Sequence, residues 1–132
     1  MTWMLDTDTC IELIRHRPPE LVERLRGQPI GEVVLSSLTV AELDFGVEKS
    51  SERARNRVAL ERFLLPFDIL PFDRAAAGRY GRLRAELTGR GSLIGSMDML
   101  IAAHALATGS TLVTHNQRDF RKVEGLALED WL

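Results

Sequence analysis

The chain has 132 residues, of which 45% are hydrophobic and 27% are charged, and its formal net charge is −2. This length fits one domain of ordinary size, so we expect residues 1–132 to fold as a single unit. The weakly acidic balance excludes binding to nucleic acid through bulk positive charge, although local basic patches remain open. Cys10 is the only cysteine, which excludes an internal disulfide and favours a reducing, cytoplasmic location.

No apolar segment of the chain predicts a membrane span. The first one, residues 3–5, meets Asp6 at once, and no run of 18 apolar residues follows anywhere. We therefore expect a soluble, unprocessed protein that has no membrane partner.

The basic residues are strongly biased towards arginine. Lys49 and Lys122 are the only lysines among 17 basic residues. Arginine suits bidentate contacts with phosphate, but a GC-rich genome that favours arginine codons explains the bias equally well. Five arginines could flank a functional edge or could be solvated: Arg15, Arg17, Arg53, Arg55 and Arg57.

The first half of the chain alternates short apolar segments with helical patterns. Residues 3–5 predict a strand ending at Asp6, residues 7–17 a helix, and residues 20–26 a second helix ended by Gly27. Residues 33–35 predict the next strand. Two helices follow, over residues 39–49, with Glu42 in the first turn, and over residues 52–65, with Val58, Leu60, Phe63 and Leu64 as the apolar side.

The second half repeats this alternation. Residues 69–70 predict a brief strand, and Asp73 caps a helix that runs to Leu87. The most apolar helix covers residues 97–107, with Asp98 in its first turn, where the helix dipole favours an anion. The remaining elements are a strand over residues 111–114, a polar turn over residues 115–119 and a last edge strand over residues 126–128.

Strands separated by helices pair in parallel through right-handed crossovers. The pattern therefore predicts an α/β fold in which helices flank a central parallel sheet of four to five strands. The carboxyl ends of such strands and the starts of the following helices share one edge of the sheet. We expect four acids at these positions to converge there: Asp6, Glu42, Asp98 and Asp119.

Converging carboxylates require a cation. At about 4 Å a like-charged pair costs roughly 4 kcal/mol at an effective dielectric near 20. Mg²⁺ and Mn²⁺ prefer oxygen ligands, and such ions can activate a water and neutralise the charge that develops at a phosphodiester. The four acids therefore favour a metal site for phosphodiester hydrolysis.

Each of these acids also has a structural explanation. Asp6 could cap the helix after it, Glu42 could be an ordinary first-turn acid, and Asp119 could cap a short turn. Asp98 fits this explanation less well, because its helix is too apolar to face water. Asp8 suits a capping residue better than a metal ligand, but both interpretations stay open.

Other catalytic chemistries find little support in the sequence. His16, His104 and His115 show no ligand spacing, and His104 on an apolar helix suits a core histidine. The chain has no cysteine pair for zinc, no phosphate-binding glycine loop and no nucleophilic serine elbow. Asp6-Thr7-Asp8 is similar to the two-aspartate signature of haloacid dehalogenase-type phosphatases, but neither lysine stands where those enzymes need one.

The motifs together resemble a PIN-domain ribonuclease, and specifically the VapC toxins of VapBC toxin–antitoxin pairs. The resemblance covers essentially the whole chain, and the order and spacing of the short motifs carry it. The matching segments are Met4-Leu5-Asp6-Thr7-Asp8, Ala41-Glu42-Leu43 with Gly46, Ile94-Gly95-Ser96-Met97-Asp98, Ile101-Ala102-Ala103-His104-Ala105, Leu112-Val113-Thr114-His115-Asn116, Asp119-Phe120, and the ending from Val123 to Trp131.

This resemblance implies a single PIN domain over residues 1–132 with the activity of a metal-dependent endoribonuclease. It implies Mg²⁺, with Mn²⁺ as a substitute, at Asp6, Glu42, Asp98 and Asp119, and products with a 5′-phosphate and a 3′-hydroxyl. It further implies inhibition of translation through an RNA target, with tRNA such as the initiator tRNA as the expected class. The implied partners are a VapB-type antitoxin, a second copy of the chain, and operator DNA bound by the larger complex.

Two positions depart from the family pattern. Asp8 stands where many relatives carry Asn, which adds a negative charge, and Ser96 stands where Pro is frequent, which leaves the start of the next helix less rigid. Neither change removes an expected ligand. A PIN-like module without catalytic activity is the alternative from another class, and the complete set of four acids argues against it.

Overall fold

Five short parallel strands form the centre of the fold, in the order β3-β2-β1-β4-β5. The structure is a computed structural model that describes all of residues 1–132. The predicted α/β class and the parallel sheet are confirmed, and the sheet has five strands. The strands are β1 (Trp3–Leu5), β2 (Val33–Ser36), β3 (Asp68–Leu70), β4 (Thr111–Val113) and β5 (Leu128–Glu129).

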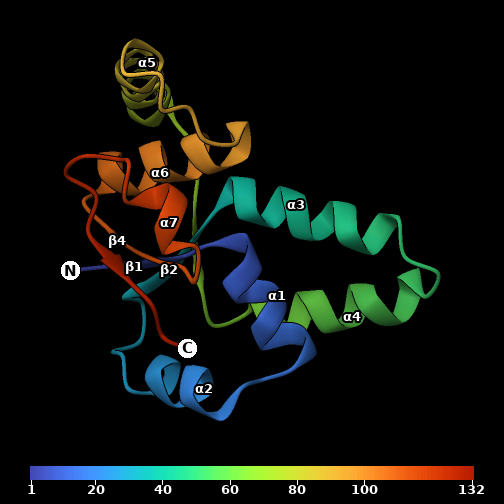
Figure 1. The fold of residues 1–132 in the computed structure, drawn as a ribbon. Coiled ribbons are helices and arrows are strands. Elements are labelled where there is room, and N and C mark those ends of the chain that lie inside the picture. The colour runs from blue at the N-terminus through green and yellow to red at the C-terminus, as the bar shows by residue number, and fades with distance from the viewer.

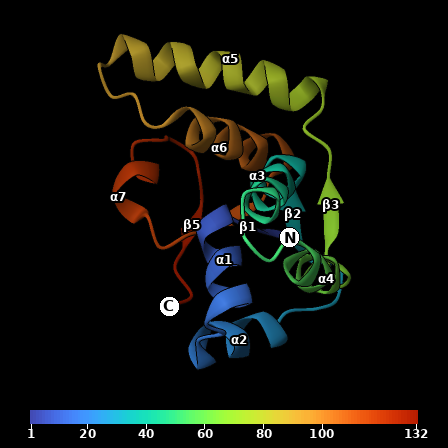
Figure 2. The same ribbon diagram turned by 90° about the vertical axis from the view of Figure 1, so that its right-hand side faces the viewer.

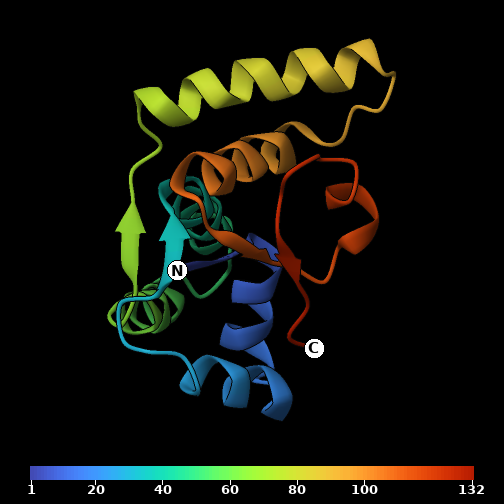
Figure 3. The same cartoon turned by 90° about the vertical axis from the view of Figure 1, so that its left-hand side faces the viewer.

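Seven helices surround this sheet, and two of them, α3 and α4, form a hairpin that projects from the body (Figure 1). Figure 2 shows α5 lying along α6, above the sheet in that view, and α1 and α2 below it. Figure 3 shows β3 in yellow-green at one edge of the sheet and the red C-terminal strand at the other. The helices are α1 (Thr7–Arg15), α2 (Pro19–Arg26), α3 (Ser37–Glu48), α4 (Arg53–Leu64), α5 (Arg74–Gly89), α6 (Ser96–Thr108) and α7 (Gln117–Phe120).

The sheet separates two hydrophobic cores. Successive side chains of a strand point to opposite faces, so Met4 joins one buried cluster and Leu5 the other. The first cluster packs the sheet against α5 and α6, through residues such as Leu83 and Ile101. The second packs it against α1 to α4. This three-layer arrangement fixes where each helix begins relative to the strand ends.

Several element boundaries differ from the sequence expectation. Helix α1 ends at Arg15 rather than at residue 17, because Arg17 adopts a left-handed backbone with a φ of 46° just before a proline. Helix α3 begins at Ser37, because the Ser36 hydroxyl caps it and accepts the Leu38 N–H at 3.0 Å. Glu42 therefore lies in the second turn of α3, and its predicted first-turn position is wrong.

Two further expectations need correction. The last strand covers Leu128–Glu129 rather than residues 126–128. Val58 was expected on the apolar side of α4, but 52% of it is exposed, and Leu60 is the buried residue of that helix. The polar turn at residues 115–119 also contains the start of the short helix α7.

Candidate metal centre

An open cleft lies where β1 and β2 end, between α1, α3 and the start of α6. Helix α3 packs against both α1 and α6 (Figure 1). The acidic residues that line the cleft are Asp6, Asp8, Glu42 and Asp98. The structure therefore brings three of the four predicted site acids to one cleft, together with Asp8.

Asp6 is the most buried of these acids. It follows β1 directly and caps α1, where its Oδ1 accepts the Thr9 N–H at 2.8 Å. Burial raises the pKa of the Asp6 carboxyl, and hydrogen bonds from Thr114 and Thr9 partly offset that rise. Capping, the structural alternative considered for Asp6, is thus observed, and it leaves the carboxylate at the cleft.

Glu42 reaches the cleft from the second turn of α3. The Thr7 hydroxyl donates a hydrogen bond of 2.6 Å to Glu42 Oε1, and it lies 3.3 Å from the Thr39 hydroxyl. Thr7 is the first residue of α1, so this bond connects the helices that carry Asp6 and Glu42. It holds the Glu42 carboxylate in one orientation.

Asp98 has the least compensated charge in the cleft. It is half-buried in the first turn of α6. Burial, followed by the negative charges of Asp6, Asp119, Asp8 and Glu42, raises the pKa of Asp98 to about 6, and no hydrogen bond counteracts this rise. A carboxylate that four other acids repel is a position that a cation would stabilise.

Asp119 approaches the same acids from the short helix α7. Its carboxylate accepts the Asn116 side-chain amide at 3.2 Å and lies 3.9 Å from the Lys122 ammonium. Asp119 is near enough to raise the pKa of Asp98, but it is not among the residues that line the cleft. Asn116, rather than Asp119, caps α7.

Asp8 is not the cap that the sequence suggested. Asp6 has that role, and Asp8 is an exposed acid in the first turn of α1 that faces the cleft. His104, by contrast, is the core histidine that was expected: it is buried, and its Nδ1 lies 2.8 Å from the Ser36 hydroxyl. Burial lowers the pKa of His104.

The cleft also contains two cations and an aromatic ring. Arg15, one of the five arginines considered above, lines it, as do Lys49 and Phe45, which the sequence reasoning missed. Residues 42, 45 and 49 are spaced at three and seven positions along α3, a helical spacing that could have placed them on one face. Arg17, Arg53, Arg55 and Arg57 are outside the cleft, and Arg57 pairs with Asp44, Glu48 and Glu61.

The donor set fits a hard divalent cation. The acidic side chains at the cleft offer carboxylate oxygens, which suit Mg²⁺ and Mn²⁺ rather than a soft metal. No three His, Cys, Asp or Glu side chains lie close enough together to hold an ion by themselves. Mg²⁺ usually retains several waters and binds only one or two carboxylates, so a loosely gathered set of acids remains compatible with it.

Comparison with known proteins identifies the family. The family model of the PIN domain matches residues 3–126. The chain is 41% identical to the "tRNA(fMet)-specific endonuclease VapC" of Shigella flexneri over 99% of this chain and 98% of that protein. It is 42% identical to the "Ribonuclease VapC2" of Haemophilus influenzae over 100% of this chain and 99% of that one. The chain belongs to the PIN-domain family, and within it to the VapC group.

Solved structures agree with this assignment. The structure of DNA-bound VapBC from Salmonella typhimurium matches with a TM-score of 0.96 and 38% identity, over 100% of this chain and 99% of that one. VapBC2 from Rickettsia felis, bound to a DNA fragment from its promoter, matches with a TM-score of 0.93 and 36% identity over the whole of both chains. The predicted PIN fold is therefore confirmed. None of the helices has the length and apolar character that crossing a membrane requires.

Proposed function

We propose that the protein is a metal-dependent endoribonuclease, the toxin of a VapBC-type toxin–antitoxin pair, which inhibits translation by cleaving RNA. The observation that carries this proposal is the cleft at the ends of β1 and β2, which Asp6, Asp8, Glu42 and Asp98 line together. The raised pKa of Asp98, which results from burial and from four neighbouring acids, agrees with it. Such repulsion serves no structural purpose in the apoprotein. Relatives named as ribonucleases and endonucleases support the choice of RNA as the substrate.

Asp6, Glu42, Asp98 and Asp119 are the residues that would hold Mg²⁺, or Mn²⁺ in its place. When bound, such an ion supplies a nucleophilic water at neutral pH and neutralises charge on the phosphodiester.

The residues around these acids orient them. The Thr9 N–H fixes Asp6, the Thr7 hydroxyl fixes Glu42, and the Asn116 amide fixes Asp119. Partners of this kind commonly control metal affinity, and their loss costs about 10–100-fold in activity or affinity. Asp98 alone has no such partner, so its carboxylate is free to move towards a bound cation.

The partners follow from the relatives. Because one relative is a tRNA(fMet)-specific endonuclease, we propose tRNA, such as the initiator tRNA, as the substrate. Because matching structures are VapBC complexes on DNA, we propose a VapB-type antitoxin, a toxin homodimer and a larger complex on operator DNA. An apolar groove between α1, α3 and α4 shares Ile11, Arg15, Glu42 and Gly46 with the acidic cleft, so an antitoxin segment seated there would block the acids.

The test is cleavage of RNA by the purified chain, freed of any antitoxin. Total tRNA is incubated with the protein in Mg²⁺, in Mn²⁺ and in EDTA, and the end groups of the products are determined. We expect cleavage with either metal, none in EDTA, and products carrying a 5′-phosphate and a 3′-hydroxyl. The absence of metal-dependent cleavage of any cellular RNA would reject the proposal and favour a binding module.

A further inference from the structure

Phe45 is an unusual residue for the wall of an acidic cleft. It lies on α3, 64% of it is exposed, and it lines the same cleft as Asp6 and Asp98. Exposed phenylalanines are costly in water, because burying such a ring is worth about 1.5–3 kcal/mol in general. The ring packs into neither hydrophobic cluster of the fold, so the structure itself does not explain its position.

A positively charged side chain lies close to the Phe45 ring. The Lys49 ammonium lies 5.3 Å from the centroid of the Phe45 ring, and Lys49 also lines the cleft. A cation–π contact at an exposed site is weak, so the ammonium can exchange the ring for a stronger anionic partner. The aromatic face and the positive charge are therefore available together, about one helical turn from Glu42 for Phe45 and about two turns for Lys49.

This combination matches the chemistry by which proteins bind single-stranded nucleic acid. Aromatic side chains stack on unpaired bases, and nearby lysines or arginines contact the adjoining phosphates. We propose that Phe45 stacks on one unpaired base of the RNA next to the cleaved bond, and that Lys49 contacts a neighbouring phosphate. This inference rests on the proposed ribonuclease function and adds to it that the substrate must be single-stranded at the site.

The position of Phe45 separates this role from binding of an antitoxin. The apolar groove between α1, α3 and α4 includes Leu43, Gly46 and Val47 of α3 but not Phe45. Phe45 lines only the cleft that holds the acids. The positive charge of Lys49, which lines the cleft and not the apolar groove, favours an anionic, base-bearing occupant over an apolar peptide segment.

The test measures binding of a labelled single-stranded oligoribonucleotide to the full chain in an Asp98→Asn background, which prevents cleavage. We expect Phe45→Ala to weaken binding about tenfold, within the range of roughly 5- to 150-fold that one stacked base contributes. Phe45→Trp should retain the affinity, whereas Phe45→Leu, which is apolar but has no aromatic face, should lose most of it. Leu93→Ala is the matched control, since Leu93 is 51% exposed and lies outside the cleft.

A series of oligonucleotides, each with one abasic position, makes the test specific. We expect one position at which removing the base weakens binding to the Phe45 protein but has no further effect on Phe45→Ala. A duplex of the same sequence should bind both proteins equally, because its bases are not free to stack. Equal effects of Phe45→Ala and Leu93→Ala, or the absence of any coupled abasic position, would overturn the inference. An effect on antitoxin binding with unchanged RNA binding would overturn it too.

Lys49 is tested through salt dependence. Lys49→Gln should weaken RNA binding at all abasic positions alike and reduce the slope of log K against log salt by about one phosphate contact. Arg26→Gln, at the far end of α2, is the control and should leave the slope unchanged. An unchanged slope in Lys49→Gln would remove the phosphate contact from the proposal.

Measuring RNA cleavage as well as RNA binding separates a failure of this inference from a failure of the ribonuclease function on which it rests. In a chain with Asp98 intact, we expect Phe45→Ala to raise KM about tenfold with little change in kcat. Cleavage that does not depend on Phe45 would reject the stacking role and leave the ribonuclease. Phe45-dependent binding to single-stranded RNA without any cleavage would support the subsite while rejecting the ribonuclease.

Discussion

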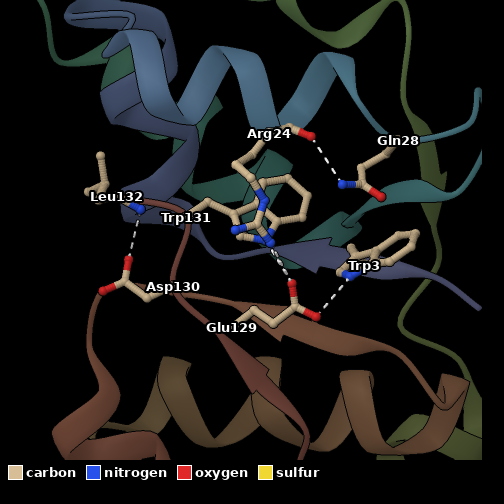
Figure 4. Close-up of polar contacts among 7 residues, drawn as sticks. All are labelled: Trp3, Arg24, Gln28, Glu129, Asp130, Trp131 and Leu132. Carbon is tan, nitrogen blue, oxygen red and sulfur yellow. Dashed lines mark hydrogen bonds and ion pairs between the residues drawn. The ribbon is translucent and has the colours of Figure 1, made fainter.

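Glu129 and Asp98 are both partly buried acids, and their surroundings are opposite. Glu129 ends β5 and accepts hydrogen bonds from Trp3 Nε1 at 3.2 Å, from Trp131 Nε1 at 2.9 Å and from Arg24 at 3.1 Å (Figure 4). The Arg24 guanidinium also lies 5.3 Å from the centroid of the Trp131 ring. Asp98 has four other acids nearby and no hydrogen bond that offsets their charge.

This difference separates a structural acid from a functional one. A partly buried acceptor with three donors is satisfied within the protein and connects the two ends of the chain. An acid that four other acids repel and that accepts no hydrogen bond is not satisfied, and the protein keeps it at a cost in stability. The comparison therefore predicts that changes at Asp98 affect activity, whereas changes at Glu129 affect stability.

The largest expected effect concerns RNA cleavage. Asp98→Asn should reduce the metal-dependent rate by at least about 100-fold, because even residues that only orient metal ligands contribute about 10–100-fold. Glu129→Gln should leave the rate within about twofold. Rates measured on the same RNA at saturating Mg²⁺ decide this. Comparable losses in both variants would break the distinction between the two acids.

The second effect concerns stability. Glu129→Ala removes the acceptor of three donors, and we expect it to lower the free energy of unfolding by about 1–3 kcal/mol. The Glu129 side chain is partly exposed, so its ion pair with Arg24 contributes only a small part of this. Urea denaturation measures the change. Glu124→Ala is the control: its carboxylate is exposed and lies 3.5 Å from Arg90, and we expect a change below about 0.5 kcal/mol.

The third effect concerns the orientation of Glu42. Thr7→Val keeps the shape of the side chain but removes the donor of the 2.6 Å hydrogen bond, and we expect a roughly tenfold lower cleavage rate. Thr7→Ser retains a hydroxyl and should retain most of the rate. Activity assays combined with thermal unfolding check the prediction. Full activity in Thr7→Val would show that this hydrogen bond does not orient a functional carboxylate.

The smallest effect is the pH dependence of stability without metal. Since the pKa of Asp98 is about 6 in the folded protein and 3.8 ordinarily, ionisation of Asp98 disfavours folding. This penalty is absent below pH ~4, grows between pH ~4 and ~6, and is complete above that range. In EDTA, Asp98→Asn should stabilise the protein by about 1 kcal/mol at pH 7.5, since solvent screens a half-buried carboxylate, and by almost nothing at pH 4. If Asp98→Asn stabilised the protein equally at pH 7.5 and at pH 4, ionisation of Asp98 would not be the source of the penalty.

The sequence correctly predicted the strands and the edge of the sheet at which the acids gather, and this success has a physical reason. Short apolar strands such as residues 33–35 are followed by polar caps, and parallel topology then forces residues such as Asp6 and Asp98 to one edge. Whether a segment forms a helix or a strand depends mainly on local residue patterns, and these patterns can be recognised in a single sequence. The grouping of acids at the cleft follows from topology alone, and their identity as metal ligands remains a prediction.

The details that the sequence missed depend on contacts between distant residues. Because Ser36 caps it, α3 begins at Ser37, two residues before the expected start, and only the finished β2–α3 junction shows that. Exposure of Val58 depends on how the α3–α4 hairpin projects from the body (Figure 1). Phe45 and Lys49 were missed because the sequence does not show which face of α3 lines the cleft, and only the structure places both residues there.

Binding of Mn²⁺ tests the central claim most directly, because it does not require the RNA target to be known. Free Mn²⁺ is followed by its paramagnetic resonance signal during titration of the purified, antitoxin-free chain at pH 7.5. The wild-type chain and Glu129→Gln should bind Mn²⁺ with the same affinity, and Asp98→Asn should bind it at least tenfold more weakly. Unchanged binding in Asp98→Asn, or no binding by the wild-type chain, would contradict the account.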